Sequence, residues 1–211
     1  MSVDPAIPPG ARARTPSPTR QAKYRAEKQV IMRAAYELIQ RDGSKETSVH
    51  DVLRKTGYST RAFYRHFRSK DELVLAFLQE RERRWTNEWL RAEAERRGAT
   101  AAERMLAIFD VFGEWFVVDD FEGCAFINVL LEYDDRENAI RQATVEHLRN
   151  IRSFLRELAT EAGASDPEAL AHQWHILMKG SIVAAGEGDQ LAARRAREIG
   201  QLLLEREAIA T

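Results

Sequence analysis

The chain has 211 residues, of which 44% are hydrophobic and 31% charged, so its composition indicates a globular protein with a sizeable core. Five of its six prolines lie in the first 18 residues, and the scarcity of helix breakers afterwards favours an all-helical body. The single cysteine, Cys124, excludes an internal disulfide and a thiolate-rich metal cluster and fits a reducing compartment. No apolar run is long enough for a membrane helix and no secretion signal opens the chain, so we expect a cytoplasmic protein without a membrane partner.

The net charge of −1 hides an asymmetry along the chain. Residues 1–80 hold 15 Lys and Arg against 9 Asp and Glu, whereas residues 81–211 hold 17 against 24. A basic first third on an acidic remainder indicates that one part meets a polyanion such as nucleic acid. Residues 1–19 have the proline-rich composition of a disordered segment. They are either a solvated tail or a flexible basic arm that rests on phosphates.

Hydrophobic periodicity and capping residues predict about nine helices and no strands. The first ends at Asp42-Gly43, and the second begins at Thr47 or Ser48 with Asp51 as an acidic capping-box partner. Ser59 caps a third, and Ser69 with Glu72 predicts a full capping box for a fourth. The later helices are expected over residues 48–55, 59–66, 69–98, 100–118, 124–133, 136–162, 165–185 and 189–208.

The segment from Thr47 to Leu73 holds two short capped helices joined by a turn that contains Gly57. The first has an inward apolar face, and the second is largely polar on its surface. Such a pair is typical of a helix-turn-helix, whose second helix enters the major groove of DNA.

At fixed spacing across these helices, the chain resembles the TetR/AcrR-like transcriptional regulators. The matching residues are Ile31, Ala34, Ala35, Leu38, Gly43, Thr47, Val49, Asp51-Val52, Gly57-Tyr58-Ser59, Phe63-Tyr64-Arg65-His66-Phe67 and Ser69-Lys70-Asp71-Glu72-Leu73. The resemblance covers residues 28–78, and beyond residue 80 only the helical layout and the length agree. It implies a DNA-binding domain over residues 20–68 and a helical effector-binding and dimerisation domain over residues 69–211. The helix that starts near Ser69 bridges the two.

The start of the helix capped by Ser59 is the predicted base-reading surface. Thr60 and Arg61 would point at base edges, where Arg61 could pair with guanine O6 and N7. The resemblance assigns phosphate contacts to Tyr64 and His66. Lys70 adds a cation at a helix N-terminus, where an anion is favoured. The full predicted set is Ser48, His50, Ser59, Thr60, Arg61, Tyr64, His66 and Lys70.

Three of these residues have a second interpretation. Arg61 could be an ordinary solvated arginine, and His50 could be a plain surface residue. His66 could instead be a buried partner of the cap that begins the next helix.

In the second domain, the resemblance implies an apolar effector pocket between the helices. The candidate lining residues are Trp89, Phe109, Phe112, Phe116, Asn128, His147, Trp174 and Met178, although core packing must account for most of the aromatic side chains. The last two helices carry more apolar residues than one buried face needs, so they predict a four-helix dimer interface. Its candidate residues are Trp174, Leu177, Ile182, Leu202 and Leu203.

Other chemistry finds little support in the sequence. His172 and His175 have the spacing of a metal pair, but no third ligand completes a site, and no catalytic or cofactor signature is present. We therefore expect no enzyme, no cofactor and no metal. The favoured hypothesis is a homodimeric repressor that binds a palindromic operator in double-stranded DNA and is released by a small apolar organic effector. The alternative is an all-helical ligand-binding or scaffolding dimer without operator function.

Overall fold

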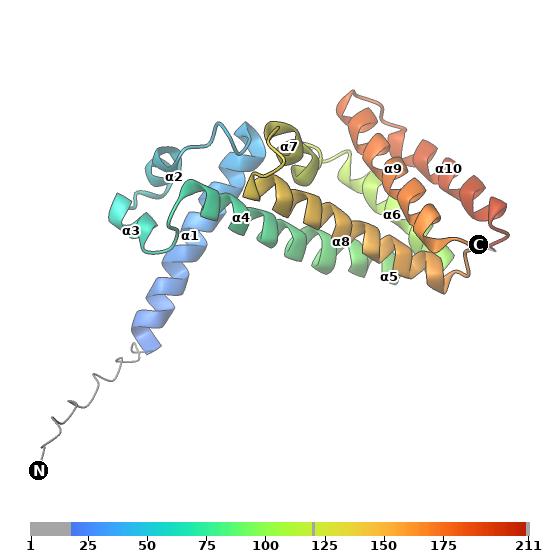
Figure 1. Cartoon of the computed structure of the whole chain (residues 1–211), viewed down its shortest axis with the longest axis horizontal. Helices are drawn as coiled ribbons and strands as arrows, with labels where there is room; N and C mark the ends of the chain where they lie inside the picture. The colour runs from blue at the N-terminus through green and yellow to red at the C-terminus, as the bar shows by residue number, and fades with distance from the viewer. Residues whose placement is uncertain (1–17, 120, 210–211) are drawn as a thin grey trace, which may run out of the picture.

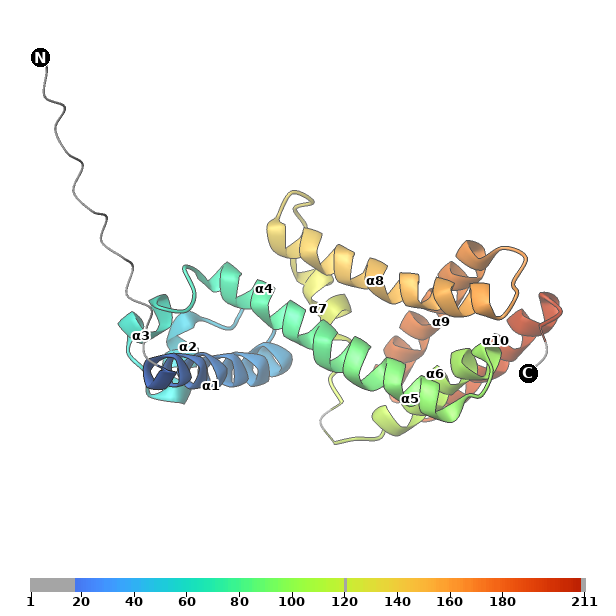
Figure 2. The ribbon, with the colours of Figure 1, turned by 90° about the horizontal axis from the view of Figure 1, so that it is seen from below.

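The computed structural model describes residues 18–119 and 121–209, and every secondary-structure element within these ranges is helical (Figure 1). The molecule is elongated: α1, α2 and α3 form one end, and α6, α9 and α10 form the other (Figures 1 and 2). The predicted disordered tail lies outside the described residues, except for Pro18 and Thr19, which begin α1. Proline is tolerated in the first turn of a helix because its missing N–H would be unpaired there anyway.

The N-terminal end is a helix-turn-helix built from α1 (Pro18–Asp42), α2 (Val49–Thr56) and α3 (Thr60–Tyr64). Its core consists of side chains that the three helices turn inward, and the most buried are Ile31, Ala35, Val52 and Phe63, each 0% exposed. Gly57 ends α2 with φ 70, the left-handed conformation that glycine adopts without steric cost. The predicted turn between the two short helices is therefore confirmed.

A single long helix leaves this end and enters the rest of the molecule. It consists of α4 (Lys70–Arg81), a π-helical stretch η1 (Glu82–Arg91) and α5 (Ala92–Arg97), without a break between them. Its extent matches the prediction, but the π-helical stretch was not predicted. The predicted capping box is wrong in one bond: the Ser69 hydroxyl accepts the Glu72 N–H at 3.1 Å, but the Glu72 carboxylate accepts the N–H of Arg68, at 2.6 Å.

The remaining helices form the C-terminal body. They are α6 (Ala101–Trp115), α7 (Ala125–Glu132), α8 (Ala139–Glu161), α9 (Pro167–Gly186) and α10 (Ala192–Arg206). With α4, η1 and α5 counted as one helix, the described residues hold nine helices, as predicted. Several helix ends differ from the prediction by a few residues; α8, for example, begins after Asn138, whose side chain caps it by accepting the Ile140 N–H at 2.9 Å.

The core of the body depends on a close approach between α10 and α9. Trp174 of α9 is 0% exposed, and Gly200 of α10 faces its indole ring. A Cβ atom at Gly200 would lie 2.8 Å from Cη2 of Trp174 and 3.2 Å from Cε2 of Phe109. Glycine therefore sets the distance between the two helices.

No helix in the described ranges has the length and apolar character needed to cross a membrane.

Candidate nucleic-acid interface and ligand pocket

The helix α3 turns a polar face to solvent. Ser59 caps it, with its hydroxyl accepting the Ala62 N–H at 3.2 Å. Phe63 points into the core, whereas Thr60 and Arg61 are exposed. Tyr64, one turn further on, is 54% exposed. Three of the side chains expected to contact DNA, those of Thr60, Arg61 and Tyr64, are therefore exposed on α3.

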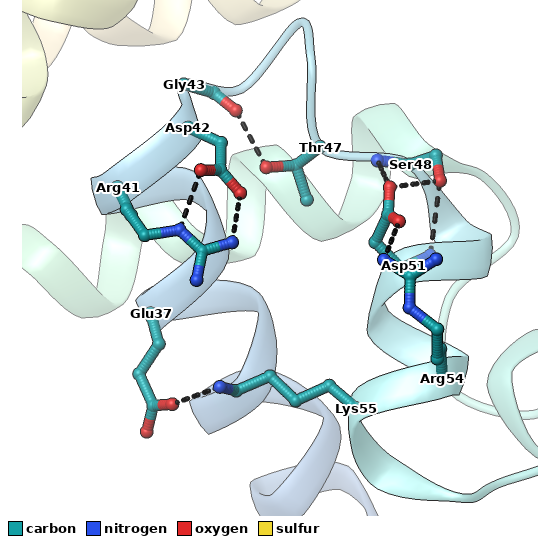
Figure 3. A network of polar contacts seen from close by, with 9 residues as sticks. All are labelled: Glu37, Arg41, Asp42, Gly43, Thr47, Ser48, Asp51, Arg54 and Lys55. Atoms are coloured by element: carbon teal, nitrogen blue, oxygen red, sulfur yellow. Dashed lines mark hydrogen bonds and ion pairs between the residues drawn. The ribbon is translucent and has the colours of Figure 1, made fainter.

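Arg61 differs from Arg54 and Lys55 of α2 because, among the described residues, it has no ion-pair or hydrogen-bond partner. Lys55 pairs with Glu37 at 2.9 Å and Arg54 with Asp51 at 2.7 Å, and both pairs are drawn in Figure 3. An unpaired guanidinium breaks no existing ion pair when it binds a base or a phosphate. Arg61 is therefore the basic side chain of this face that is best prepared for a new partner.

The start of α2 is held rigidly by a capping box. The Ser48 hydroxyl accepts the Asp51 N–H at 3.1 Å, and the Asp51 carboxylate accepts the Ser48 N–H at 3.1 Å (Figure 3). Hydrogen bonds from the Ser48 side chain and backbone lower the pKa of Asp51. Ser48 thus has a structural role, and a DNA contact of its own stays a prediction. His50, beside it on α2, is exposed, which fits either interpretation.

The structure corrects the prediction for His66. Its side chain is 0% exposed, so it cannot contact phosphate in this conformation. The ring lies against that of Tyr24 of α1, with centroids 4.2 Å apart, and Nε2 lies 3.2 Å from Glu27 Oε1. The alternative, a buried His66, is therefore the right one, but its partners are on α1 and not at the cap of the next helix.

These contacts dock the first half of α1 onto the end of α3, which sequence reasoning missed. Glu27 also binds Arg65 at 2.6 Å, and the Tyr24 hydroxyl donates to the Arg65 carbonyl at 3.2 Å. Although partial burial opposes it, hydrogen bonds from Arg65 and His66 lower the pKa of Glu27. The only local signal was a tyrosine and a glutamate one turn apart in an otherwise basic segment.

A second group of contacts joins the helix-turn-helix to the C-terminal body. The Glu132 carboxylate, at the end of α7, accepts the Ser44 N–H at 3.1 Å, the Ser44 hydroxyl at 2.6 Å and the Lys45 N–H at 2.7 Å. The Lys70 ammonium, at the start of α4, donates to the Lys45 carbonyl at 2.5 Å. We call this set the Glu132 latch. These bonds attach the loop between α1 and α2 to both α7 and α4. They also engage the Lys70 ammonium, which was predicted to face DNA.

Most of the predicted effector residues are packed in the core. Phe109, Phe112 and Trp174 are at most 1% exposed: the Phe109 ring lies 5.4 Å from Trp174, and the Phe112 ring lies 6.0 Å from Trp85 of η1. Trp89 and Phe116 are half-buried at the edge of an aromatic cluster around Trp115.

Two polar residues of the predicted pocket, Asn128 and His147, already have partners. Asn128 is exposed and donates to the Glu122 carbonyl at 3.0 Å. His147 binds Glu82 through Nδ1 at 2.8 Å and stacks on Phe126. Core packing and local hydrogen bonds account for these residues without a ligand, and their place in an effector pocket stays a prediction.

A small cavity does lie between η1, α7, α8 and α9. Its walls are apolar side chains such as Trp85, Cys124, Ile151 and Met178, and its volume is about 10 Å³, room for roughly one water molecule. We call it the Trp85 cavity. Met178 is the one residue of the predicted pocket that lines it.

The predicted dimer residues divide into buried residues and residues that reach the surface. Trp174 and Ile182 are buried in their own subunit, so they are corrected to core residues, while Leu177 and Leu203 are half-buried. Leu202 is 63% exposed and stays a candidate.

The two histidines with the spacing of a metal pair lie in different environments. His175 is 3% exposed, whereas His172 lies outside, with Nε2 3.2 Å from the Glu168 carboxylate. Within the described residues no group of three or more His, Cys, Asp and Glu is placed to hold a metal ion.

Comparison with known families shows which family the chain belongs to. The model of bacterial regulatory proteins of the tetR family matches residues 31–77, and the tetracyclin repressor-like C-terminal domain matches residues 101–199. The chain belongs to the TetR family. It is therefore a DNA-binding transcriptional regulator, with the fold and the helix-turn-helix that the resemblance implied. This finding favours the DNA-binding hypothesis over the scaffolding alternative.

The chain is also similar to individual transcriptional regulators. The HTH-type transcriptional regulator YjdC of Escherichia coli is 21% identical over 74% of this chain and 81% of its own length. A solved TetR transcriptional regulator from Streptomyces avermitilis is 28% identical, with a TM-score of 0.76, and the match covers 87% of this chain and 99% of that one. A TetR-family regulator from Streptomyces coelicolor, 21% identical with a TM-score of 0.77 over 88% of this chain and 98% of that one, has the same fold.

Proposed function

We propose that the protein is a homodimeric repressor that binds a palindromic operator through two copies of α3 and is released by a small, largely apolar effector. The observation that carries the proposal is an exposed apolar stripe on α9 and α10, at the end of the molecule remote from α3 (Figure 1). Ile176 is 65% exposed, Val183 51%, Ile199 49% and Leu202 63%. Apolar surface gathered in this way on two packed helices is typical of an obligate interface.

Gly180 supports a helix-to-helix contact at this stripe. It is exposed on α9 between Ile176 and Val183, and no atom lies within 4 Å of the position that its Cβ would take. A glycine inside a helix costs about 1 kcal/mol relative to alanine, and nothing among the described residues requires one here. A partner helix crossing close to the backbone at Gly180 accounts for it.

A two-fold axis through the stripe presents two α3 helices, as a palindrome requires. Thr60 and Arg61 would then contact base edges, and Tyr64, Ser59 and His50 would contact backbone. A dimer seated on an operator excludes other proteins from it, so repression needs no further surface. The effector would act through differential affinity for two arrangements of the helix-turn-helix ends (α1–α3, here called the heads). The Glu132 latch and the long helix of α4, η1 and α5 would connect each head to the C-terminal body.

The experiment is selection of binding sites from random duplex DNA by the full chain, followed by sedimentation of the free protein and its complex. We expect enrichment of inverted half-sites and two chains per site, with a dimer at micromolar concentration in the absence of DNA. The variant Ile176→Glu, which places a charge on the stripe, should give monomers, while Ile151→Val in the core should not. A monomer of the unaltered chain, or enrichment of a single half-site, would contradict the proposal.

A further inference from the structure

The first half of α1 extends beyond the core of the head. The first core side chain of α1 is Ile31, and of residues 19–30 all but Gln21 and Glu27 are exposed. Figure 1 shows this half projecting from the head on the side away from the C-terminal body. We call residues 19–30 the α1 extension. A helix without a buried apolar face gains little stability from packing, so a partner outside the subunit accounts for it best.

The α1 extension carries positive charge that the described part of the chain does not neutralise. It holds four basic residues against one acidic residue, Glu27, and that carboxylate already pairs with Arg65. Lys23 and Arg25 are exposed, and neither forms an ion pair or a hydrogen bond among the described residues. Cations held on one exposed segment attract a polyanion.

Two side chains of the extension attach it to the end of α3. The ring of Tyr24 lies 4.2 Å from that of His66, centroid to centroid, and its hydroxyl donates to the Arg65 carbonyl at 3.2 Å. One turn later, Glu27 Oε1 accepts a hydrogen bond from Arg65 Nη2 at 2.6 Å. We call Tyr24, Glu27, Arg65 and His66 the Tyr24 hook. Because Arg65 and His66 directly follow α3, the hook fixes the extension relative to the recognition helix.

The two ends of α1 therefore have different attachments. The loop that follows its C-terminal end is bound to the body through the Glu132 latch, whereas its first half is bound to α3. The major groove is about 12 Å wide and admits one helix. A second helix attached to the end of α3 cannot share that groove, so it meets the phosphates of the strand at the groove's edge.

We propose that the α1 extension is a second DNA-contact element, which binds backbone phosphates through Lys23 and Arg25. Tyr24 and Glu27 are positioning residues that hold it beside α3. Phosphate contacts carry no sequence information, so the extension adds affinity for any duplex while α3 supplies discrimination. The inference rests on the DNA binding within the proposed function and needs neither the dimer nor the effector.

The test is the salt dependence of DNA affinity for the full chain, measured by fluorescence anisotropy on the selected operator and on a random duplex of equal length. Each phosphate contact contributes about 0.9 to the slope of log affinity against log salt. Lys23→Gln with Arg25→Gln should therefore make the slope less steep by about 1 to 2. Both duplexes should weaken by a similar factor, about tenfold or more at roughly 0.1 M salt. Arg33→Gln, which removes an exposed arginine from the second half of the same helix, should change neither quantity.

Tyr24→Ala tests the hook, because it leaves both cations in the chain and removes the ring that holds them in place. It should make the slope less steep, whereas Tyr24→Phe, which keeps a ring against His66, should retain most of it. Added to the variant that lacks Lys23 and Arg25, Tyr24→Ala should have no further effect on the slope, since a positioning residue acts only through the groups it positions. The melting temperature of each variant checks that the core of the head remains folded.

An unchanged slope without Lys23 and Arg25 would overturn the inference. So would a loss confined to the operator, because backbone contacts do not distinguish sequences. A native slope in Tyr24→Ala would reject the hook as a positioning device. The random duplex separates this inference from the proposed function: a chain that selects no palindrome but shows the expected change on random DNA retains the extension and rejects the repressor. Selection of a palindrome with an unchanged slope retains the repressor and rejects the extension.

Discussion

The substitution Glu132→Ala removes the carboxylate on which the Glu132 latch depends. Three donors lose their acceptor: the Ser44 N–H, the Ser44 hydroxyl and the Lys45 N–H, at 3.1, 2.6 and 2.7 Å. Lys45 is exposed and can bind water, and the Ser44 hydroxyl keeps Tyr133 at 3.2 Å. The Ser44 N–H has no such replacement, because Ser44 is 0% exposed. One buried unpaired donor and one weakened hydroxyl bond give an expected loss of about 2 kcal/mol.

Hydrogen exchange read at single amides measures this loss where it occurs. About 2 kcal/mol corresponds to roughly thirtyfold more frequent opening, so the Ser44 and Lys45 amides should exchange about thirtyfold faster in Glu132→Ala. The control is Glu146→Ala, which removes an exposed carboxylate paired with Arg149 on α8 and should alter stability by less than about 0.5 kcal/mol. Unchanged protection at Ser44 would refute the reasoning, because it would mean that the latch contributes no free energy to holding the head on the body.

Three further predictions follow from the packing and the charges. Gly200→Ala should destabilise the fold by about 1–3 kcal/mol, because its Cβ would lie 2.8 Å from Trp174; Gly186→Ala, with no atom within 4 Å, is the matched control, and equal melting temperatures would contradict the packing argument. The pKa of Glu27 is lowered in the folded chain, so its contribution is present above the ordinary pKa near 4.5 and is lost as the pH falls through the lowered value. Acid should therefore loosen α1 from α3, seen as line broadening at Arg65 and His66, and Glu27→Gln should show no such acid dependence. Gly180→Leu should leave the fold of each subunit nearly unaltered, because no atom lies within 4 Å of the added Cβ, but it should raise the dimer dissociation constant at least tenfold in sedimentation. An unaltered dissociation constant would remove Gly180 from the interface.

The sequence was most informative where the determining contacts are local. The Ser48 capping box, the Ser59 cap and the turn at Gly57 each depend on residues within four positions, and each was predicted correctly. The polar side of α3 followed from the same short-range pattern. Helix boundaries were predicted to within a few residues because their capping residues are adjacent in the chain.

Contacts between distant residues could not be predicted in this way. The Glu132 latch joins residues 88 positions apart, and nothing in the local pattern at Ser44 indicates an acceptor. His66 matched a phosphate-contact position, but its burial depends on Tyr24, which only the folded arrangement of α1 brings to it.

Core residues and surface residues of the last two helices could not be told apart for a different reason. Helix α9 is apolar on more than one face, so periodicity does not tell the buried Trp174 and Ile182 from the exposed Ile176 and Val183. Pairing of α9 with α8 and α10 settles which face is covered, and that pairing is tertiary. The π-helical stretch leaves no local residue pattern from which it could be predicted.

The central claim is that α3 recognises a specific DNA sequence, and Arg61→Ala tests it most directly. Affinity is measured by fluorescence anisotropy at one fixed salt concentration, for the selected operator and for a random duplex of equal length, with Arg41→Ala as the control for loss of an exposed arginine. Loss of a base contact should cost about 1–3 kcal/mol on the operator and much less on random DNA, with the fold unaltered. An equal loss on both duplexes would show that Arg61 contacts only the backbone, and no loss on either would contradict the assignment of α3 as the recognition helix.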